Sequence, residues 1–273
     1  MSVGIKRRDE SVTTTSRIRY TTDRGVASIT IDCPAKKNAL NDQGWSDLAD
    51  ALEQATHDPD VRVVQLQGTG GDLCSGMDLE ESASQDHPVD RMRRLNQVAD
   101  RLFEMPKPVV TTIDGVATGA GLSMALSSDF VLATPESKFS AIFVQRGLTP
   151  DCGAAWLLVH QNSLLTAKRM AMLGEIIDGT TAKELGWVTW LHPETELQQQ
   201  KESLVNRLLN MSPRALAETK ALLNHAAGTT FTDSLKMEAL AQTINLGTDA
   251  PEAFNAFVEG RNPQYDGKWR VEL

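Results

Sequence analysis

Apolar residues in the first two hundred positions follow two alternating patterns. Runs rich in β-branched residues predict strands at 26–31, 61–67 and 109–113. Between these runs, apolar residues recur at the spacing of an amphipathic helix, first at Trp45, Leu48, Ala49 and Leu52 and then at Met92, Leu95, Val98 and Leu102. This order of strand, turn and helix predicts an α/β core with mostly parallel strands.

The pattern becomes purely helical from about Thr195 onward, with breaks near Gly228 and Gly247. Residues 1–15 are polar without an apolar stretch, which is typical of a disordered tail rather than a signal peptide. We therefore predict a tail over 1–15, a catalytic core over 16–210 and a helical module over 211–273. The polar stretch 80–88 is predicted to be a mobile loop over a site.

Two glycine-bearing turns carry the strongest chemical signal. Residues 68–79 read GTGGDLCSGMDL and residues 115–122 read GVATGAGL. Each turn follows a predicted strand, and each is expected to open into a helix. Two such turns can direct backbone N–H groups at one ligand oxygen, which is the construction of an oxyanion hole.

At these turns the chain resembles the crotonase (enoyl-CoA hydratase/isomerase) superfamily, and the resemblance extends from about Ile18 to Trp269. Residues 34–41, PAKKNALN, are similar to the family's first CoA-binding turn, and residues 253–267 are similar to its closing helix and tail. The resemblance implies the crotonase (ClpP-like) spiral ββα fold, an α/β fold. It also implies that the C-terminal helices assemble the chain into a trimer, often paired into a hexamer.

The resemblance implies a site for an acyl-CoA thioester. The backbone N–H groups of Met77 and Ala120 would stabilise the enolate oxygen. The acyl pocket would be lined by Gly76, Gly119, Gly121, Ser123 and Phe143, and CoA would be bound by Lys36, Lys37, Ala39, Ser75 and Lys268.

The acid and base groups differ from those of hydratases of this family. Hydratases have glutamates where this chain has Ser123 and Phe143, and neither replacement can exchange a proton as a carboxylate does. Segment 147–158 instead resembles isomerases that act on 2-(1,2-epoxyphenylacetyl)-CoA or on 3-enoyl-CoA, where an aspartate at the position of Asp151 moves the proton. Without the resemblance, Asp151 after Pro150 could equally begin a helix.

The sequence thus predicts an isomerase that moves a double bond from the 3-enoyl to the 2-enoyl position, or acts on a ring-bearing analogue, with Asp151 as proton shuttle. Three alternatives stay open: hydratase or lyase chemistry, nucleophilic attack by Asp151 as in 4-chlorobenzoyl-CoA dehalogenase, and acyl-CoA binding without catalysis. Ser123 lies in an incomplete G-x-S-x-G pattern and is expected to be a small pocket residue.

Net charge and the numbers of cysteines and histidines restrict the binding partners and the cellular compartment that we expect for this chain. The net charge of −9 disfavours nucleic acid, including RNA, and no apolar run is long enough for a membrane span. Three separated cysteines and scattered histidines match no metal spacing, which indicates a reducing cytoplasmic location and no metal. We expect no cofactor, since CoA is part of the substrate, and we expect Asp78 and Asp129 to be structural.

Overall fold

The computed structural model describes residues 16–81 and 87–270, and its core is built on a six-stranded sheet. The strand order is β1-β2-β3-β4-β6-β9, antiparallel between β1 and β2 and parallel elsewhere. The strands are β1 (Ile18–Asp23), β2 (Val26–Ile31), β3 (Val63–Gly68), β4 (Val109–Ile113), β6 (Phe130–Ala133) and β9 (Trp190–Leu191). The mostly parallel sheet predicted from the sequence is confirmed.

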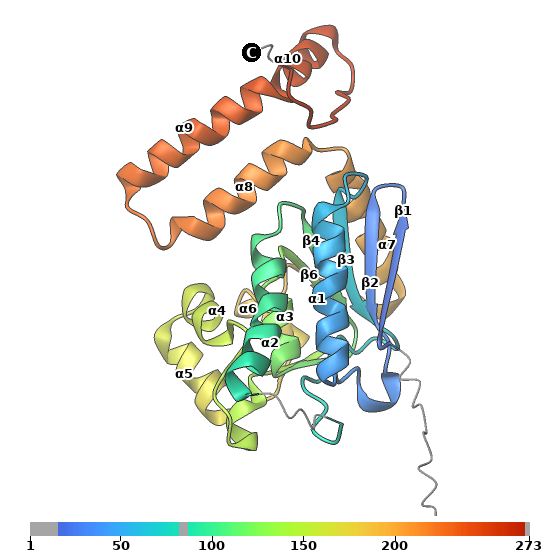
Figure 1. Ribbon diagram of the computed structural model, residues 1–273, viewed down its shortest axis with the longest axis vertical. Helices are drawn as coiled ribbons and strands as arrows, with labels where there is room; N and C mark the ends of the chain where they lie inside the picture. Colours follow the sequence, from blue (N-terminus) through green and yellow to red (C-terminus); the bar gives the residue numbers. More distant parts are fainter. Residues whose placement is uncertain (1–15, 82–86, 271–273) are drawn as a thin grey trace, which may run out of the picture.

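Helices cover both faces of this sheet because its strands alternate apolar side chains to either side. On one face, Val63 and Val110 pack with Leu208 of α7 (Glu194–Leu209). On the other, Val64 and Leu66 belong to the larger core, which is closed by α1 (Asp42–His57), α2 (Pro88–Glu104) and α3 (Ala120–Leu126). Figure 1 shows α1 and α2 in front of the sheet and α7 behind it.

A second, three-stranded sheet of order β5-β7-β8 lies beside the first, formed by β5 (Val116–Thr118), β7 (Lys138–Ser140) and β8 (Ile177–Asp178). Between β7 and β8 the chain forms η2 (Ile142–Arg146), α4 (Ala154–Gln161) and α5 (Leu164–Leu173), and α6 (Gly179–Glu184) follows β8. A further short helix, η1 (Pro34–Lys36), lies between β2 and α1.

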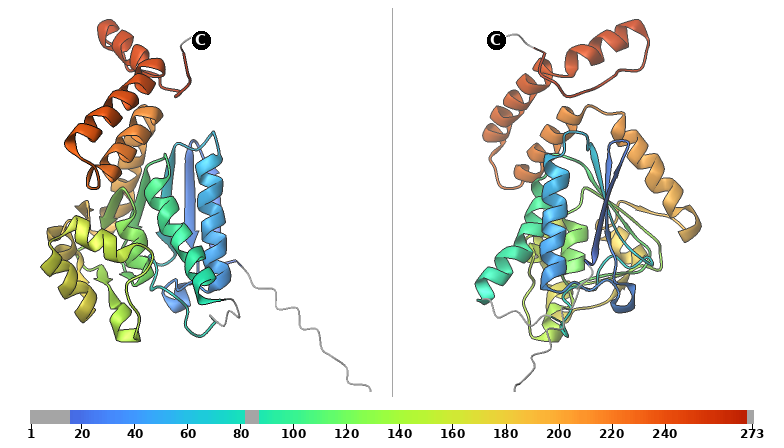
Figure 2. Two further views of the ribbon diagram at one scale, coloured as in Figure 1. Left: turned by 60° about the vertical axis from the view of Figure 1, so that its left-hand side comes forward. Right: turned by 45° about the vertical axis from the view of Figure 1, so that its right-hand side comes forward.

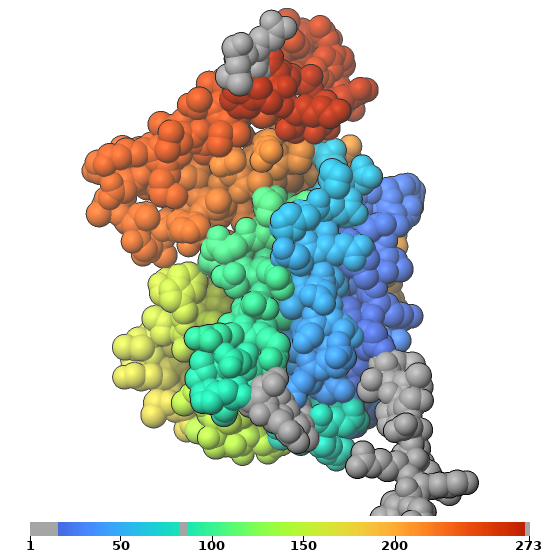
Figure 3. All heavy atoms as spheres, viewed as in Figure 1, coloured from blue at the N-terminus to red at the C-terminus, as the bar shows by residue number. Residues whose placement is uncertain are grey.

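The last three helices project from the core as an arm (Figures 1 and 2). They are α8 (Pro213–Ala226), α9 (Phe231–Gly247) and α10 (Ala250–Glu259). The tail after α10 folds back on the arm, since Arg270 N donates to Gly247 O at 2.8 Å and Asp249 accepts bonds from the backbone of Asp266 and Gly267. Figure 3 shows the arm occupying one end of the molecule.

Two local expectations need correction. Only the second glycine turn opens directly into a helix, since α2 begins at Pro88, well after the first turn ends at Leu79. The second turn, 115–122, also contains a further short strand, β5, before α3 begins. Most of the predicted loop 80–88 lies outside the described residues. Among residues 16–81 and 87–270, no helix is long and apolar enough to cross a membrane, and no group of metal-binding side chains occurs.

Candidate active site

The first glycine turn is held in place by the buried amide of Asn38. Its Nδ2 donates to the carbonyl oxygens of Thr69 at 3.0 Å and Asp72 at 2.6 Å. Further along, Leu40 N donates to Gly76 O at 3.0 Å. Segment 33–41 therefore fixes both ends of the turn, because each of its buried polar groups has a specific partner.

The second turn is bonded directly to the first. Thr118 N donates to Cys74 O at 3.1 Å, and Gly119 N donates to Ser140 O at 3.0 Å. A β carbon at Gly121 would lie 2.0 Å from Cys74 O, so no other residue fits without separating the turns. Gly121 therefore acts by allowing close backbone approach, and it does not line the cavity as the sequence led us to expect.

The two predicted oxyanion donors lie side by side. Gly76 has φ of +103°, and a β carbon there would be 3.7 Å from Ala120 N. Among the described residues, neither Met77 N–H nor Ala120 N–H has a hydrogen-bond partner. Ala120 is the first residue of α3, where backbone N–H groups lack partners within the helix. Both N–H groups are thus available to an external acceptor.

Met77 and Ala120 line one cavity of about 520 Å³, a volume typical of small-molecule sites. Its inner wall is apolar and includes the buried side chains of Leu95 and Phe143. Asp151 is the only acidic residue among the described residues that line this cavity. The site therefore combines two free N–H donors, an apolar wall and one carboxylate.

Asp151 does not begin a helix, because α4 starts at Ala154 with Gly153 as its N-terminal cap. Its Oδ1 atom is buried and has no hydrogen-bond partner among the described residues. Burial raises the pKa of the Asp151 carboxyl above its ordinary value, because the charged form loses hydration. A desolvated carboxylate of this kind is a stronger base than an exposed one.

Ser123 lies behind the cavity rather than in its wall. It is fully buried in α3, and its Oγ donates to the backbone carbonyl of Asp151 at 3.0 Å. A buried, hydrogen-bonded hydroxyl is not placed as a nucleophile or as a pocket contact. The predicted pocket residues that line the cavity are Gly76, Gly119 and Phe143.

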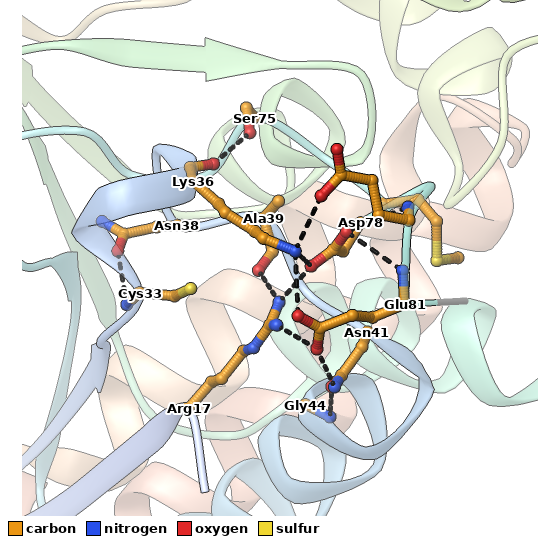
Figure 4. Close-up of polar contacts among 12 residues, drawn as sticks. Arg17, Cys33, Lys36, Asn38, Ala39, Asn41, Gly44, Ser75, Asp78 and Glu81 are labelled. Atoms are coloured by element: carbon orange, nitrogen blue, oxygen red, sulfur yellow. Dashed lines mark hydrogen bonds and ion pairs between the residues drawn. The ribbon is translucent and has the colours of Figure 1, made fainter. Parts of the chain in front are cut away.

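Lys36 is surrounded by carboxylates (Figure 4). Its Nζ lies 2.9 Å from Asp78 Oδ2, 2.9 Å from Glu81 Oε1 and 3.2 Å from Glu80 Oε2, and hydrogen bonds to Glu81 and Asp78 raise its pKa. This ammonium group is neutralised within the chain and does not line the cavity, in contrast to its expected role with CoA. Arg17 also binds Asp78, at 2.8 Å.

Three cations lie at the exposed side of the cavity, Lys37, Lys138 and Arg146, and none forms an ion pair with a described residue. Ser75 also lines it, with its Oγ donating to Lys36 O at 3.1 Å. The other expected CoA contacts lie elsewhere. Ala39 is buried, with its carbonyl bound by Arg17, and Lys268 lies in the tail that is hydrogen-bonded to the arm.

Sequence reasoning missed several residues of the cavity. Leu95 was recognised only as a position on an amphipathic helix, and Lys138 and Arg146 stand in no motif. The signal for Leu95 was its place on the buried face of α2, which packs against α3. The other missed residues are Leu79, Val116, Thr118, Ile142, Leu148 and Ile176.

A hollow of about 560 Å³ occurs on the other face of the sheet, between β1, β2, β3 and α7. Its lining is largely polar and includes Gln65, Gln198 and Asn206. Neither glycine turn reaches it, so it lacks the free N–H pair found in the first cavity. The cavity with Asp151 is therefore the candidate active site.

Comparison with known proteins agrees with this geometry. The Enoyl-CoA hydratase/isomerase family model matches residues 21–268. The 1,2-epoxyphenylacetyl-CoA isomerase of Escherichia coli is 31% identical over 253 residues, covering 90% of this chain and 97% of that protein. The trans-2-decenoyl-[acyl-carrier-protein] isomerase of Streptococcus mutans is 29% identical, covering 92% and 98%.

Solved structures show the same fold. The crystal structure of an enoyl-CoA hydratase from Polaromonas sp. JS666 aligns with a TM-score of 0.84 and 29% identity, covering 91% of this chain and 99% of that one. The family match covers nearly the whole length of the chain. The paired glycine turns and the two free N–H groups agree with it. The chain belongs to the enoyl-CoA hydratase/isomerase family of crotonase-fold proteins.

Proposed function

We propose that this protein is an acyl-CoA isomerase that moves a double bond from the 3-enoyl to the 2-enoyl position of a thioester, or acts on a ring-bearing analogue. The observation that carries the proposal is Asp151, the one carboxylate among the described residues of a cavity that also presents two free N–H groups. The similarity to an isomerase of epoxyphenylacetyl-CoA supports it.

The reaction follows from these groups. The Asp151 carboxylate removes a proton from carbon 2 of the 3-enoyl thioester, and the electron pair spreads over the dienolate to the thioester oxygen. Met77 N–H and Ala120 N–H stabilise this oxygen, each by about 3 kcal/mol. Asp151 then returns the proton to carbon 4, which leaves the double bond between carbons 2 and 3. No cofactor is needed in this sequence of steps.

One carboxylate is sufficient for isomerisation because the proton removed is the proton returned. Hydration would need a further group to activate water while the first acts on carbon 2. Ser123 is buried and hydrogen-bonded to a backbone carbonyl, and the Phe143 side chain has no group that can donate or accept a proton. The described cavity therefore supports isomerase chemistry better than hydratase chemistry.

The first prediction concerns Asp151→Asn. The amide keeps the shape of the side chain but cannot accept a proton, so we expect kcat to fall by about a hundredfold or more. The measurement is turnover of cis-3-enoyl-CoA and trans-2-enoyl-CoA substrates of several chain lengths in deuterated buffer, with mass spectrometry for bond migration, hydration and deuterium uptake. Hydration without migration would contradict the isomerase assignment.

The matched control is Asp50→Asn, which neutralises an exposed aspartate of α1 and should leave turnover unchanged. Thermal unfolding at pH 7 separates chemistry from folding. Replacing a desolvated carboxylate with a neutral amide should not lower Tm. Near-normal turnover by Asp151→Asn would remove Asp151 from the mechanism.

The pH dependence follows from the direction of the Asp151 pKa shift. A base must be ionised, and burial raises this pKa. We expect kcat/KM to be lost as pH falls through a value above the ordinary aspartate pKa of about 4. An acid limb at or below that ordinary value would mean that another group limits the reaction.

A further inference from the structure

From the contacts around α3, we infer that Ser123 is a positioning residue that holds the Asp151 turn at a fixed place relative to the Ala120 N–H. The inference rests on the proposed function, and it concerns the position at which hydratases of the family have a glutamate. In this chain the Ser123 hydroxyl forms a hydrogen bond with the backbone carbonyl of Asp151, the proposed base, and does not contact the substrate.

The Asp151 carbonyl is the anchor of the turn. It accepts Ser123 Oγ at 3.0 Å and Ala154 N at 2.9 Å, so it is bound from both α3 and α4. The same Ser123 hydroxyl lies 3.4 Å from Gly119 O, at the start of α3. One buried side chain thus connects the turn that carries the base with the turn that carries the oxyanion donor.

The backbone of the turn adopts a conformation that its surroundings must hold. The two residues after Asp151 both have left-handed backbone conformations, with φ of +49° at Cys152 and +80° at Gly153. A non-glycine residue in this region is strained and persists only where its surroundings hold it. The Cys152 side chain is buried in the core, where its Sγ lies 3.7 Å from Leu95 O and is also hydrogen-bonded to the Asp151 carboxylate, whose Oδ1 has no partner among the described residues. Among the described residues, the Ser123 hydroxyl is the one side-chain group that donates to the backbone of this turn.

The consequence is geometric. Proton transfer needs the carboxylate within hydrogen-bond reach of carbons 2 and 4 while the thioester oxygen remains bound at Met77 and Ala120. A turn that moves relative to α3 changes this separation without changing the cavity surface that binds the rest of the substrate. Loss of the Ser123 hydroxyl should therefore lower kcat and leave KM nearly unchanged.

The test compares Ser123→Ala with Ser127→Ala. Both serines are buried in or at the end of α3, and Ser127 Oγ donates to Ser123 O at 2.9 Å, an equivalent buried bond that does not reach Asp151. With cis-3-hexenoyl-CoA, or the enoyl-CoA that the wild type converts fastest, Ser123→Ala should reduce kcat about ten- to hundredfold. Ser127→Ala should reduce Tm by a similar amount but keep kcat.

A second readout distinguishes positioning from stability. A freed Asp151 carboxylate can turn toward water, so the acid limb of kcat/KM should move to lower pH in Ser123→Ala and stay in place in Ser127→Ala. If Ser123→Ala does not fold, Ser123→Cys keeps the side-chain size with a weaker donor and should show a smaller change of the same kind.

Two results would overturn the inference. Normal kcat in Ser123→Ala, or equal losses in both serine variants, would show that the hydroxyl is only structural, while an inactive Asp151→Asn would leave the proposed function intact. If Asp151→Asn retains turnover, the proposed function fails first and the role of Ser123 fails with it.

Discussion

Asp78 and Asp151 are both shielded from water, yet their pKa values shift in opposite directions. Burial alone would raise both, but hydrogen bonds from Lys36 and Arg17 lower the Asp78 pKa to about 2. For Asp151, desolvation outweighs the hydrogen bond with the Cys152 side chain, which acts to lower the pKa, so the pKa rises. The same residue type is therefore held ionised at one position, and at the other it has the raised pKa that the proposed proton shuttle requires.

The ionised Asp78 should stabilise the fold. Its pKa lies about 2 units below the ordinary value, which corresponds to about 2–3 kcal/mol. Because the folded-state pKa is lowered, this contribution is present above about pH 4 and is lost as pH falls toward 2. We expect Asp78→Asn to lower the free energy of unfolding by about this amount at pH 7 and by much less at pH 2, as measured by urea titration.

Asp50→Asn again provides the comparison, since Asp50 is exposed on the solvent side of α1. It should change the free energy of unfolding by less than about 0.5 kcal/mol at either pH. An equal loss for Asp78→Asn at pH 7 and pH 2 would mean that shape, and not charge, explains the role of this residue.

At the scale of elements, the site depends on two turns whose backbones touch. Cys74 O occupies the space where a side chain at residue 121 would begin, so the absence of a side chain at Gly121 allows the turns that carry Met77 and Ala120 to approach closely. The proposed oxyanion hole therefore depends on the packing between the two turns. Neither turn could form it alone.

Gly121→Ala tests this dependence. The added methyl must displace the Cys74 carbonyl, so we expect a loss of about 1–3 kcal/mol in the free energy of unfolding together with a large fall in kcat. Gly228→Ala is the control, because its β carbon would lie 3.8 Å from His225 O and meet nothing closer. The measurements are urea unfolding and turnover, and an unchanged kcat in Gly121→Ala would contradict the packing argument.

The elements that could be predicted from sequence are those with a strong local period. β2, β4, α1 and α2 appear where apolar spacing placed them, because one face of each is buried in the same core. The roles of residues that depend on contacts between distant parts of the sequence could not be predicted from local apolar spacing. Ser123 meets Asp151 across 28 positions, and Lys36 meets Asp78 across 42, so only the fold shows which partner each has.

At the scale of the whole molecule, the helical arm exposes large apolar side chains. Phe257 and Val258 of α10 are 87% and 84% exposed, and Phe231 and Leu240 of α9 are 79% and 68% exposed. Isolated chains rarely present so many large apolar groups on two adjacent helices. We therefore expect the arm to pack against other copies of the chain, as the sequence resemblance implied.

The double substitution Phe257→Ser and Val258→Ser should weaken this assembly. Multi-angle light scattering after size exclusion should give a trimer or hexamer for the wild type and smaller species for the variant, because apolar burial drives association. Val89→Ser changes a half-exposed valine of α2 and should not alter the mass. A monomeric wild type at micromolar concentration would contradict the prediction.

Three cations, Lys37, Lys138 and Arg146, gather at the cavity of a chain whose net charge is −9, so positive charge is concentrated at one place on a negative molecule. A polyanion approaching from most sides meets repulsion, and it meets attraction near Lys37, Lys138 and Arg146, so its encounter is oriented before any contact forms. Mobile ions screen such fields over about 8–10 Å. Salt should therefore slow the arrival of an anionic ligand, while the steps around buried Asp151 proceed at the same rate.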